Sequence, residues 1–169
     1  MNSKSGRVLV SLSIATTDGE FVASYTDKGL AVLTFPNTAS KSSFSSTVAT
    51  KQILQWHKLT SAALKRALAG QLAGELPPLD DSGGTGFQRS VWHAMRKIPS
   101  GQAQSYGEIA QAIGKPKAVR AVGGACGANP IPVLVPCHRV LAANKKIGGF
   151  SGGLDWKQKL LAREGVNLF

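Results

Sequence analysis

The N-terminal part of the chain alternates between apolar and polar residues in three short runs. These are "RVLVSLSIATT", "GEFVASYT" and "GLAVLTF", separated by Asp18-Gly19 and Lys28-Gly29. A period of two places alternate side chains on one face of a strand, and turn dipeptides between such runs favour a hairpin. The pattern therefore predicts a small antiparallel hairpin or meander.

The pattern then changes from strand to helix. A Ser/Thr-rich segment, residues 37–47, predicts a loop, and Val48–Leu72 has the spacing of a helix whose core candidates are Ile53, Leu54, Leu64 and Leu68. The stretch "GELPPLDDSGGTG" holds two prolines and four glycines, which is typical of a turn or linker. We therefore expect a small α/β domain over residues 1–84, without catalytic groups, and a second domain over residues 85–169.

The second half begins with a predicted helix over "FQRSVWHAMRKI". Its apolar residues recur at helical spacing, and Pro99-Ser100-Gly101 ends it. The members of this stripe are Phe87, Val91, Met95 and Ile98. The second domain is thus predicted to be mostly α-helical.

Two further short helices follow. In "SYGEIAQAIG", Ser105 and Glu108 have capping-box spacing and Gly114 suits the C-terminal end. In "KPKAVRAVGGACGAN", Pro116 suits a first helical position. Two short helices joined by a tight, Gly-containing turn are typical of a helix-turn-helix.

The second of these helices carries almost no side-chain bulk apart from Arg120. Such a helix can pack closely against another element, because small residues often mark close approach. It can also enter a narrow groove with Arg120 pointing into a stack of bases, which the neighbouring Lys115 and Lys117 favour. Its small residues are Ala118, Ala121, Gly123, Gly124, Ala125, Gly127 and Ala128.

Charge is unevenly divided between the halves. The chain has 169 residues and a formal net charge of +11. Residues 1–84 contribute +2, from eight basic and six acidic residues, and residues 85–169 contribute +9, from twelve and three. A basic half with few acids favours a polyanion partner, nucleic acid first. A merely soluble basic surface remains the alternative.

Several protein classes are disfavoured. The opening "MNSKSGRVLVSLSIATTDGE" lacks a signal-peptide pattern, and no apolar run reaches the roughly 18 residues that a membrane span needs. Only two cysteines occur, Cys126 and Cys137, without a CxxC pair or a ligand-spaced His cluster. We therefore expect a soluble intracellular protein with neither a disulfide framework nor a zinc site.

Cys137 lies between a proline and a histidine in "NPIPVLVPCHRVLAANKKIGGFSGG". A free cysteine is often a buried structural residue. As a nucleophile it must lose its proton, which a nearby imidazole can accept. His138 supplies one, but adjacent side chains on an extended backbone point to opposite faces, so a bridging water or a turn is expected rather than direct contact.

A third group should orient that imidazole, and the second half offers three acids. Glu108 is placed as a helix cap, and Asp155 lies in the first turn of the last predicted helix. Glu164 lies near the end of that helix, where a negative charge is unfavourable. Glu164 is therefore the candidate.

These motifs together resemble the O6-alkylguanine-DNA alkyltransferase family. The resemblance rests on "PCHRV", preceded by "SYGEIA" and Asn129-Pro130 and followed by "GGFSGGL". It covers residues 86–169 in order, whereas residues 1–84 resemble the family's variable N-terminal domain only in layout. The implied second domain contains a winged-helix-like helix-turn-helix.

The resemblance implies single-turnover DNA repair without a cofactor. Some members bind zinc in the N-terminal domain, but those ligands have no evident counterparts here, so no metal is expected. The Cys137 thiolate would take the alkyl group from O6-alkylguanine, possibly also O4-alkylthymine, after His138 accepts its proton through water. Glu164 would hold the imidazole, Asn129 would brace the active-site turn, and Tyr106 would protonate the leaving guanine.

The resemblance also implies how base and DNA are held. Backbone atoms of Cys137 and Val140 would accept from the exocyclic amine, the Ser151 N–H would donate to O6, and Phe150, tyrosine in some members, would wall the pocket. The helix-turn-helix would bind the minor groove of double-stranded DNA, with Arg120 replacing the flipped base. The other DNA-contacting positions would be Lys115, Ala121 and Gly123.

Further expectations are a monomer without a membrane partner, cytoplasmic and nucleoid-associated in a prokaryote or nuclear in a eukaryote. Cys126 is expected to be a small apolar residue rather than a second acceptor. Three rival functions are a DNA-binding protein that flips alkylated bases without repair, a Cys–His hydrolase, and a regulator built on residues 102–128. The first lacks an acceptor cysteine, the second needs no helix-turn-helix, and the third leaves Cys137 unexplained.

Overall fold

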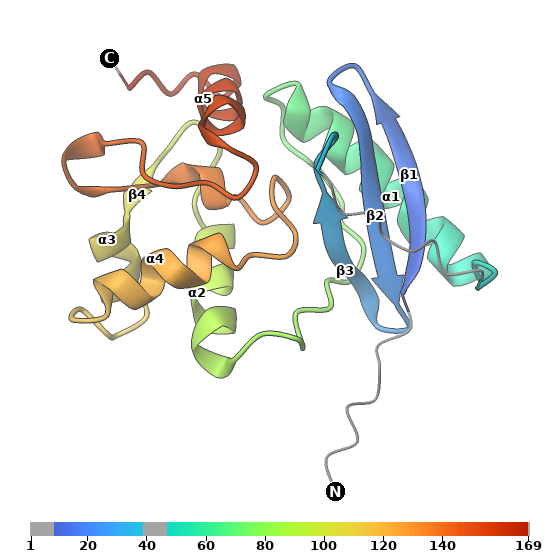
Figure 1. The fold of residues 1–169 in the computed structure, drawn as a ribbon, viewed down its shortest axis with the longest axis horizontal. Coiled ribbons are helices and arrows are strands. Elements are labelled where there is room, and N and C mark those ends of the chain that lie inside the picture. Colours follow the sequence, from blue (N-terminus) through green and yellow to red (C-terminus); the bar gives the residue numbers. More distant parts are fainter. Residues whose placement is uncertain (1–8, 39–46, 169) are drawn as a thin grey trace, which may run out of the picture.

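The computed structural model in Figure 1 describes residues 9–38 and 47–168. A three-stranded sheet and one long helix form the N-terminal half, and short helices and turns form the C-terminal half. The Ser/Thr-rich loop expected at residues 37–47 lies almost wholly outside the described residues, as do the first two residues of the first expected strand run. No helix in the described ranges is long and apolar enough to cross a membrane.

The predicted meander is present. Strands β1 (Val10–Thr16), β2 (Gly19–Thr26) and β3 (Gly29–Thr34) pair antiparallel in that order. Gly29 has φ +146°, and a Cβ there would lie 2.1 Å from the Pro78 carbonyl oxygen, so only glycine fits. The Leu30 N–H donates to that carbonyl at 2.8 Å, which ties the linker to the edge of β3.

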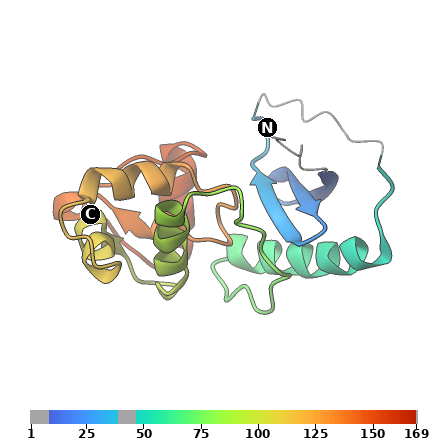
Figure 2. The ribbon, with the colours of Figure 1, turned by 90° about the horizontal axis from the view of Figure 1, so that it is seen from below.

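Helix α1 (Lys51–Leu68) covers one face of this sheet (Figure 2). The Thr50 side chain caps its N-terminus by accepting from the Ile53 N–H. Ile53, Leu64 and Leu68 are buried as predicted. The prediction for Leu54 is wrong, since it is 47% exposed. Adjacent helical residues differ by about 100° in direction, so only Ile53 of this pair faces the sheet.

The C-terminal half is a cluster of four helices: α2 (Gly86–Arg96), α3 (Tyr106–Ala112), α4 (Val119–Gly127) and α5 (Leu154–Arg163). Two-residue strands β4 (Gln104–Ser105) and β5 (Val140–Leu141) pair in parallel. Short 3-10 turns lie at η1 (Cys137–Arg139) and η2 (Ala143–Lys145). The predicted α2 stripe is buried at Val91, Met95 and Ile98 and partly buried at Phe87.

Helices α3 and α4 form the predicted pair. The capping box of Ser105 and Glu108 is present, with both hydrogen bonds made. The prediction for Pro116 is wrong, because α4 begins only at Val119. Residues 115–118 instead form a turn closed by the Ala118 N–H donating to the Lys115 carbonyl at 2.9 Å. Proline lacks an N–H, which this tight turn tolerates.

The N-terminal and C-terminal halves contact each other through hydrogen bonds and a shared apolar core. Arg163, at the end of α5, donates from both Nη atoms to the Asp18 carboxylate at 2.8 Å and from Nη1 to the Leu68 carbonyl at 2.7 Å. The Leu33 N–H donates to the Pro130 carbonyl at 2.9 Å. The buried apolar residues form one cluster that includes members of both halves. The sheet therefore packs directly against the segments around Cys137.

Candidate active site

Cys137 opens the η1 turn and lines a cavity of about 270 Å³. Its side chain is buried, with 4% of the residue exposed. Four residues selected from the sequence as catalytic or substrate-binding meet in this cavity, although they come from three separate segments. The lining is Tyr106, Gly123, Cys126, Gly127, Cys137, Gly149, Phe150 and Ser151.

His138 is held by Glu164, the acid that its unfavourable place near a helix end had singled out. The imidazole Nε2 lies 2.9 Å from Glu164 Oε1, and both side chains are at most 5% exposed. Within the described part of the chain, His138 Nδ1 is the one buried side-chain nitrogen or oxygen atom without a hydrogen-bond partner. The backbone at Cys137 and His138 forms a 3-10 turn rather than an extended strand, so the opposite-face geometry does not apply.

The pKa shifts of His138 and Glu164 favour a neutral imidazole beside an ionised carboxylate. Burial lowers the pKa of His138, and the hydrogen bond to Glu164 opposes this effect. Burial raises the pKa of Glu164, but hydrogen bonds and charges from His138 and Arg139 outweigh it and bring the pKa to about 2. An ionised carboxylate only accepts, so Nε2 carries the hydrogen and Nδ1 keeps its lone pair.

Arg139 completes the surroundings of Glu164, and sequence reasoning missed it. Its Nε and Nη2 donate to the two carboxylate oxygens at 3.0 and 2.8 Å, and Nη1 donates to the Ile98 carbonyl at 2.6 Å. This fork matches the planar carboxylate and holds Glu164 in place. The available signal was the arginine beside His138 in "PCHRV".

Lys157 is a second residue that sequence reasoning missed. It is fully buried in α5, and its Nζ donates to the Val140 carbonyl at 2.7 Å and to the Gly149 carbonyl at 3.1 Å. Burial lowers its pKa to about 8, while nearby thiols oppose that shift. Its spacing with Leu160, Leu161 and Glu164 on the inward face of the helix was the available signal.

The thiol of Cys137 experiences opposing influences. Burial raises its pKa. A hydrogen bond from Asn129, the charge of Lys157 and backbone N–H groups act in the opposite direction. For Cys126, burial raises the pKa to about 12. Of the two cysteines that line the cavity, only Cys137 has donors directed at its sulfur from another side chain.

Asn129 braces the loop that leads to Cys137. Its Nδ2 donates to the Val135 carbonyl at 2.8 Å, and its Oδ1 accepts from the Ile131 N–H at 3.0 Å. Between these contacts, buried Val133 has φ +72°, which is unfavourable for a β-branched residue. The asparagine thus holds a strained turn from both of its ends.

We expect Asn129→Ala to lower the free energy of unfolding by about 2–4 kcal/mol, because two buried backbone groups lose their partners. Chemical denaturation of the variant and of the parent protein would measure this loss. Asn167→Ala serves as the control because Asn167 is exposed and is not among the residues with a positive φ. Equal losses in both variants would contradict the bracing role of Asn129.

Tyr106 is the first residue of α3, and its side chain lines the cavity. Burial raises the pKa of its phenol, which remains a donor at neutral pH. A backbone hydrogen bond from Gly149 opposes the shift. Gly148 lies close to the hydroxyl, since a Cβ there would be 2.8 Å away.

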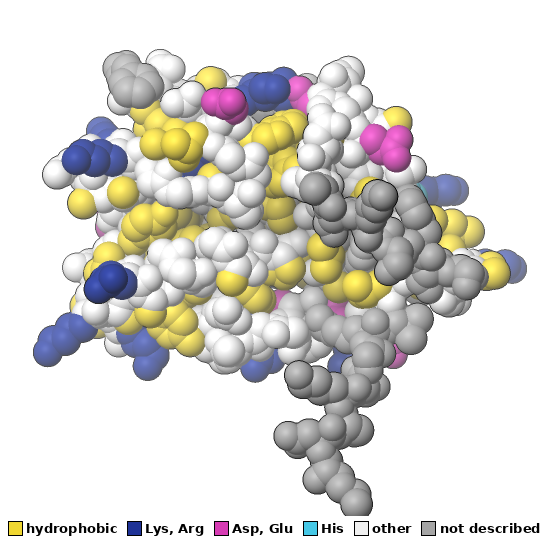
Figure 3. All heavy atoms as spheres, viewed as in Figure 1, with side chains coloured by type: hydrophobic (Ala, Val, Ile, Leu, Met, Phe, Trp, Pro, Cys, Tyr) yellow, Lys and Arg dark blue, Asp and Glu magenta, His cyan; other side chains and the backbone are white. Residues whose placement is uncertain are grey.

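The outer face of α4 carries small residues that do not contact other elements of the described chain. Val122, Ala125 and Cys126 face the core, whereas Arg120 and Ala121 are exposed. A Cβ added at Gly123, Gly124 or Gly127 would meet nothing within 4 Å. Close packing within the described protein therefore does not require these glycines. Lys and Arg side chains surround the α3–α4 end of the molecule (Figure 3).

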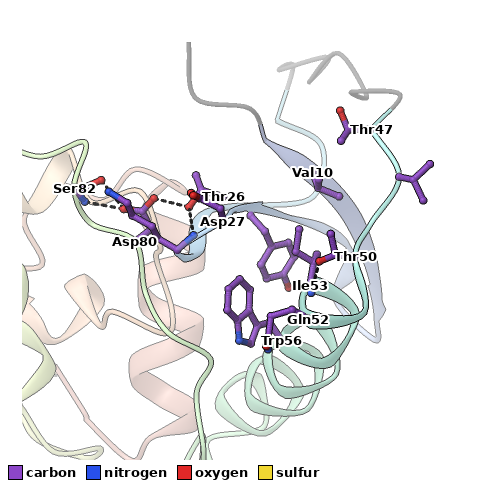
Figure 4. Close-up of a pocket in the computed structure, with 13 residues that line it drawn as sticks. Val10, Thr26, Asp27, Thr47, Thr50, Gln52, Ile53, Trp56, Asp80 and Ser82 are labelled. Carbon is purple, nitrogen blue, oxygen red and sulfur yellow. Dashed lines mark hydrogen bonds between the residues drawn. The ribbon is translucent and has the colours of Figure 1, made fainter. Parts of the chain in front are cut away.

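Larger cavities lie away from Cys137. One of about 620 Å³ opens between the sheet and the start of α1, where Thr26 Oγ1 donates to Asp80 Oδ2 at 2.5 Å (Figure 4). Another, of about 760 Å³, lies beside Asp18 and Arg163. Neither is lined by a cysteine or histidine. Among residues 9–38 and 47–168, no cluster of three or more His, Cys, Asp or Glu residues suits a metal ion.

Comparison with known proteins places the chain in a family. Residues 86–166 match the model for the DNA-binding domain of 6-O-methylguanine DNA methyltransferase. The chain is also 37% identical to Mycobacterium tuberculosis OGT in a crystal structure with DNA, with a TM-score of 0.75 and coverage of 90% of both chains. The chain belongs to the O6-alkylguanine-DNA alkyltransferase family.

Curated alkyltransferases agree over a shorter segment. The chain is 55% identical over 100 residues to the methylated-DNA–protein-cysteine methyltransferase of Mycolicibacterium paratuberculosis, covering 57% of the chain and 61% of that protein. It is 52% identical over 103 residues to the Methanosarcina acetivorans protein of that name, covering 59% and 66%. The matched segments thus span slightly less than two thirds of these relatives.

Proposed function

We propose that this alkyltransferase repairs O6-alkylguanine in DNA by moving the alkyl group irreversibly to Cys137. The observation that carries this proposal is the buried thiol in a cavity beside His138, whose Nε2 is held by Glu164 and whose Nδ1 is unpaired. The alkyl group stays on sulfur as a thioether and no step of this reaction regenerates the thiol, so each molecule acts once.

The reaction is an in-line displacement. His138 Nδ1 accepts the proton of Cys137 through a water molecule, and Glu164 stabilises the imidazolium that forms. The thiolate sulfur then bonds to the alkyl carbon as the bond between that carbon and O6 breaks, and guanine keeps the electron pair. Asn129 and Lys157 stabilise the thiolate until it attacks.

The leaving guanine needs a proton and three contacts. The Tyr106 hydroxyl donates to the ring nitrogen, and the Ser151 N–H donates to O6. The carbonyls of Cys137 and Val140 accept from the exocyclic amine. The Cys137 carbonyl accepts from the Val140 N–H and the Val140 carbonyl accepts from Lys157 Nζ, and a carbonyl oxygen can accept more than one hydrogen bond. Phe150 forms the wall against the base.

Residues 85–169 provide the DNA contacts in this proposal, and residues 1–84 form a separate N-terminal domain. Helices α3 and α4 form a winged-helix-like helix-turn-helix whose slim face enters the minor groove of alkylated double-stranded DNA. Arg120 fills the gap left by the flipped base, Lys115 contacts phosphate, and Ala121 and Gly123 allow close approach. The protein binds as a monomer.

The decisive experiment measures the intact mass of the protein after incubation with duplex DNA that contains O6-methylguanine. We expect one added methyl group per molecule, located on Cys137 by peptide mapping. Tight binding to methylated DNA without a mass change would instead support a damage-binding protein that does not repair. Continued release of free product by one molecule would support a hydrolase.

We expect Glu164→Gln to slow alkylation at neutral pH by at least about 10-fold, because a neutral partner stabilises the imidazolium less well. The apparent pKa of Cys137 should rise, so the difference from the parent should shrink as the pH increases. Single-turnover rates across a pH series would measure this change. Asp155→Asn, which removes another acid from α5, should leave the profile unchanged.

The stability of the same variant gives a separate check. The native pKa of Glu164, about 2, is below its unfolded value, so its contribution is present above about pH 4.3 and is lost as the pH falls towards 2. Glu164→Gln should therefore reduce this acid-dependent loss of stability. A pH–rate profile that overlays the parent profile would remove Glu164 from the mechanism.

A further inference from the structure

An aromatic cluster joins the N-terminal sheet to the wall of the acceptor cavity. Phe35 follows β3, is 7% exposed, and lies edge-on to Phe150, with ring centroids 5.7 Å apart. Phe150 is the cavity wall beside Cys137. Phe35 also contacts Trp156 of α5 at 5.0 Å. Phe35 is thus a side chain of the N-terminal half that packs directly against Phe150.

The backbone at Gly152 leaves little room for the rings of Phe35 and Phe150 to move. A Cβ added at Gly152 would lie 2.7 Å from Phe35 Cε2 and 3.0 Å from Phe150 Cε1. The two rings therefore pack against the bare backbone of the segment that carries Ser151. Two residues before Phe35, the Leu33 N–H donates to the Pro130 carbonyl, which fixes β3 against the loop leading to Cys137.

Phe21 provides an internal comparison. It is fully buried, and its ring contacts Phe35 at 5.4 Å and Trp156 at 5.7 Å. Among the described rings, Phe21 and Phe150 make no direct contact. Phe21 and Phe35 thus share one cluster and differ in whether they touch the cavity wall.

We propose that Phe35 is a positioning residue for the alkyl-acceptor pocket. It holds the Phe150 ring at the angle that closes the pocket on the extruded guanine and its alkyl group. This inference rests on the proposed function and gives residues 9–38 a specific part in it. Phe35 does not line the cavity and acts through its edge-to-face contact with Phe150, so the effect falls on substrate binding.

Single-turnover alkylation of Phe35→Leu tests this role. The probes are free O6-benzylguanine and a single-stranded oligonucleotide containing O6-methylguanine, neither of which requires a duplex to be opened. We expect the half-saturating concentration to rise about 3- to 10-fold, the equivalent of that aromatic pair, for the probes that the parent accepts. The limiting rate should stay within about twofold, because Cys137, His138 and Glu164 are untouched.

Two further variants keep the inference separate from folding. Gly152→Ala, which inserts a methyl group between the two rings, should raise the half-saturating concentration in the same direction. Phe21→Leu should reduce stability at least as much as Phe35→Leu, measured by thermal unfolding, and leave the half-saturating concentration unchanged. Equal effects of Phe21→Leu and Phe35→Leu, or no effect of either, would overturn the inference. A parent protein that reacts with neither these probes nor methylated duplex DNA would instead defeat the proposed function.

Discussion

Cys137→Ala is expected to abolish alkyl transfer while leaving the fold and the binding of alkylated DNA largely intact. In the proposed mechanism, the change removes the sulfur that forms the new bond to the alkyl carbon. Burial raises the pKa of both thiols, that of Cys126 to about 12, and only at Cys137 does a side-chain hydrogen bond, from Asn129, oppose the shift. The mutation removes one sulfur atom from a buried site, so the free energy of unfolding should fall by only about 1–2 kcal/mol.

Cys126→Ala is the matched control, because it removes the other buried cysteine that lines the same cavity. This variant should accept one methyl group per molecule at nearly the parent rate. Intact mass after incubation with methylated duplex DNA measures both variants, and a binding assay on the same DNA shows whether Cys137→Ala still recognises damage. Methyl transfer to Cys137→Ala would defeat the assignment of the acceptor.

Local signals explain why the helices could be predicted from the sequence. The capping box of Ser105 and Glu108 and the apolar stripe of α2 depend on neighbours within one or two turns, and both are present. Glu164 was identifiable because its place at the end of a helix conflicts with the helix dipole. The error at Leu54 concerns which face of α1 packs against the sheet, and the error at Pro116 concerns where α4 begins. Both depend on contacts with neighbouring elements and on the geometry of turns.

Contacts between distant segments could not be predicted in this way. Lys157 reaches the Val140 carbonyl, and Phe35 reaches Phe150, across sequence separations that no periodicity reports. The positive φ of Val133 is likewise invisible in a stretch of apolar residues, because Asn129 and the surrounding core impose it. The residues missed here act by supporting the catalytic groups rather than by belonging to a recognisable pattern.

Arg120→Ala should slow repair of duplex DNA by about 10- to 100-fold and leave the reaction with free O6-benzylguanine nearly unchanged, because only the duplex substrate carries an unstacking cost of roughly a few kcal/mol. Arg120 is exposed on α4, its side chain makes no hydrogen bond or ion pair with the described residues, and it does not line the Cys137 cavity. It is therefore free to enter the base stack without supporting the reacting groups.

Lys115→Ala separates that role from simple loss of charge. Lys115 is also exposed and lies in the turn before α4, so its removal deletes one positive charge near the same face. Each variant should lower the salt dependence of DNA binding by about one unit of slope. At saturating DNA, where binding no longer limits the rate, Lys115→Ala should repair duplex DNA almost normally and only Arg120→Ala should remain slow. If Arg120→Ala slows the free base and the duplex equally, Arg120 supports the pocket or the fold, and its role in base flipping is wrong.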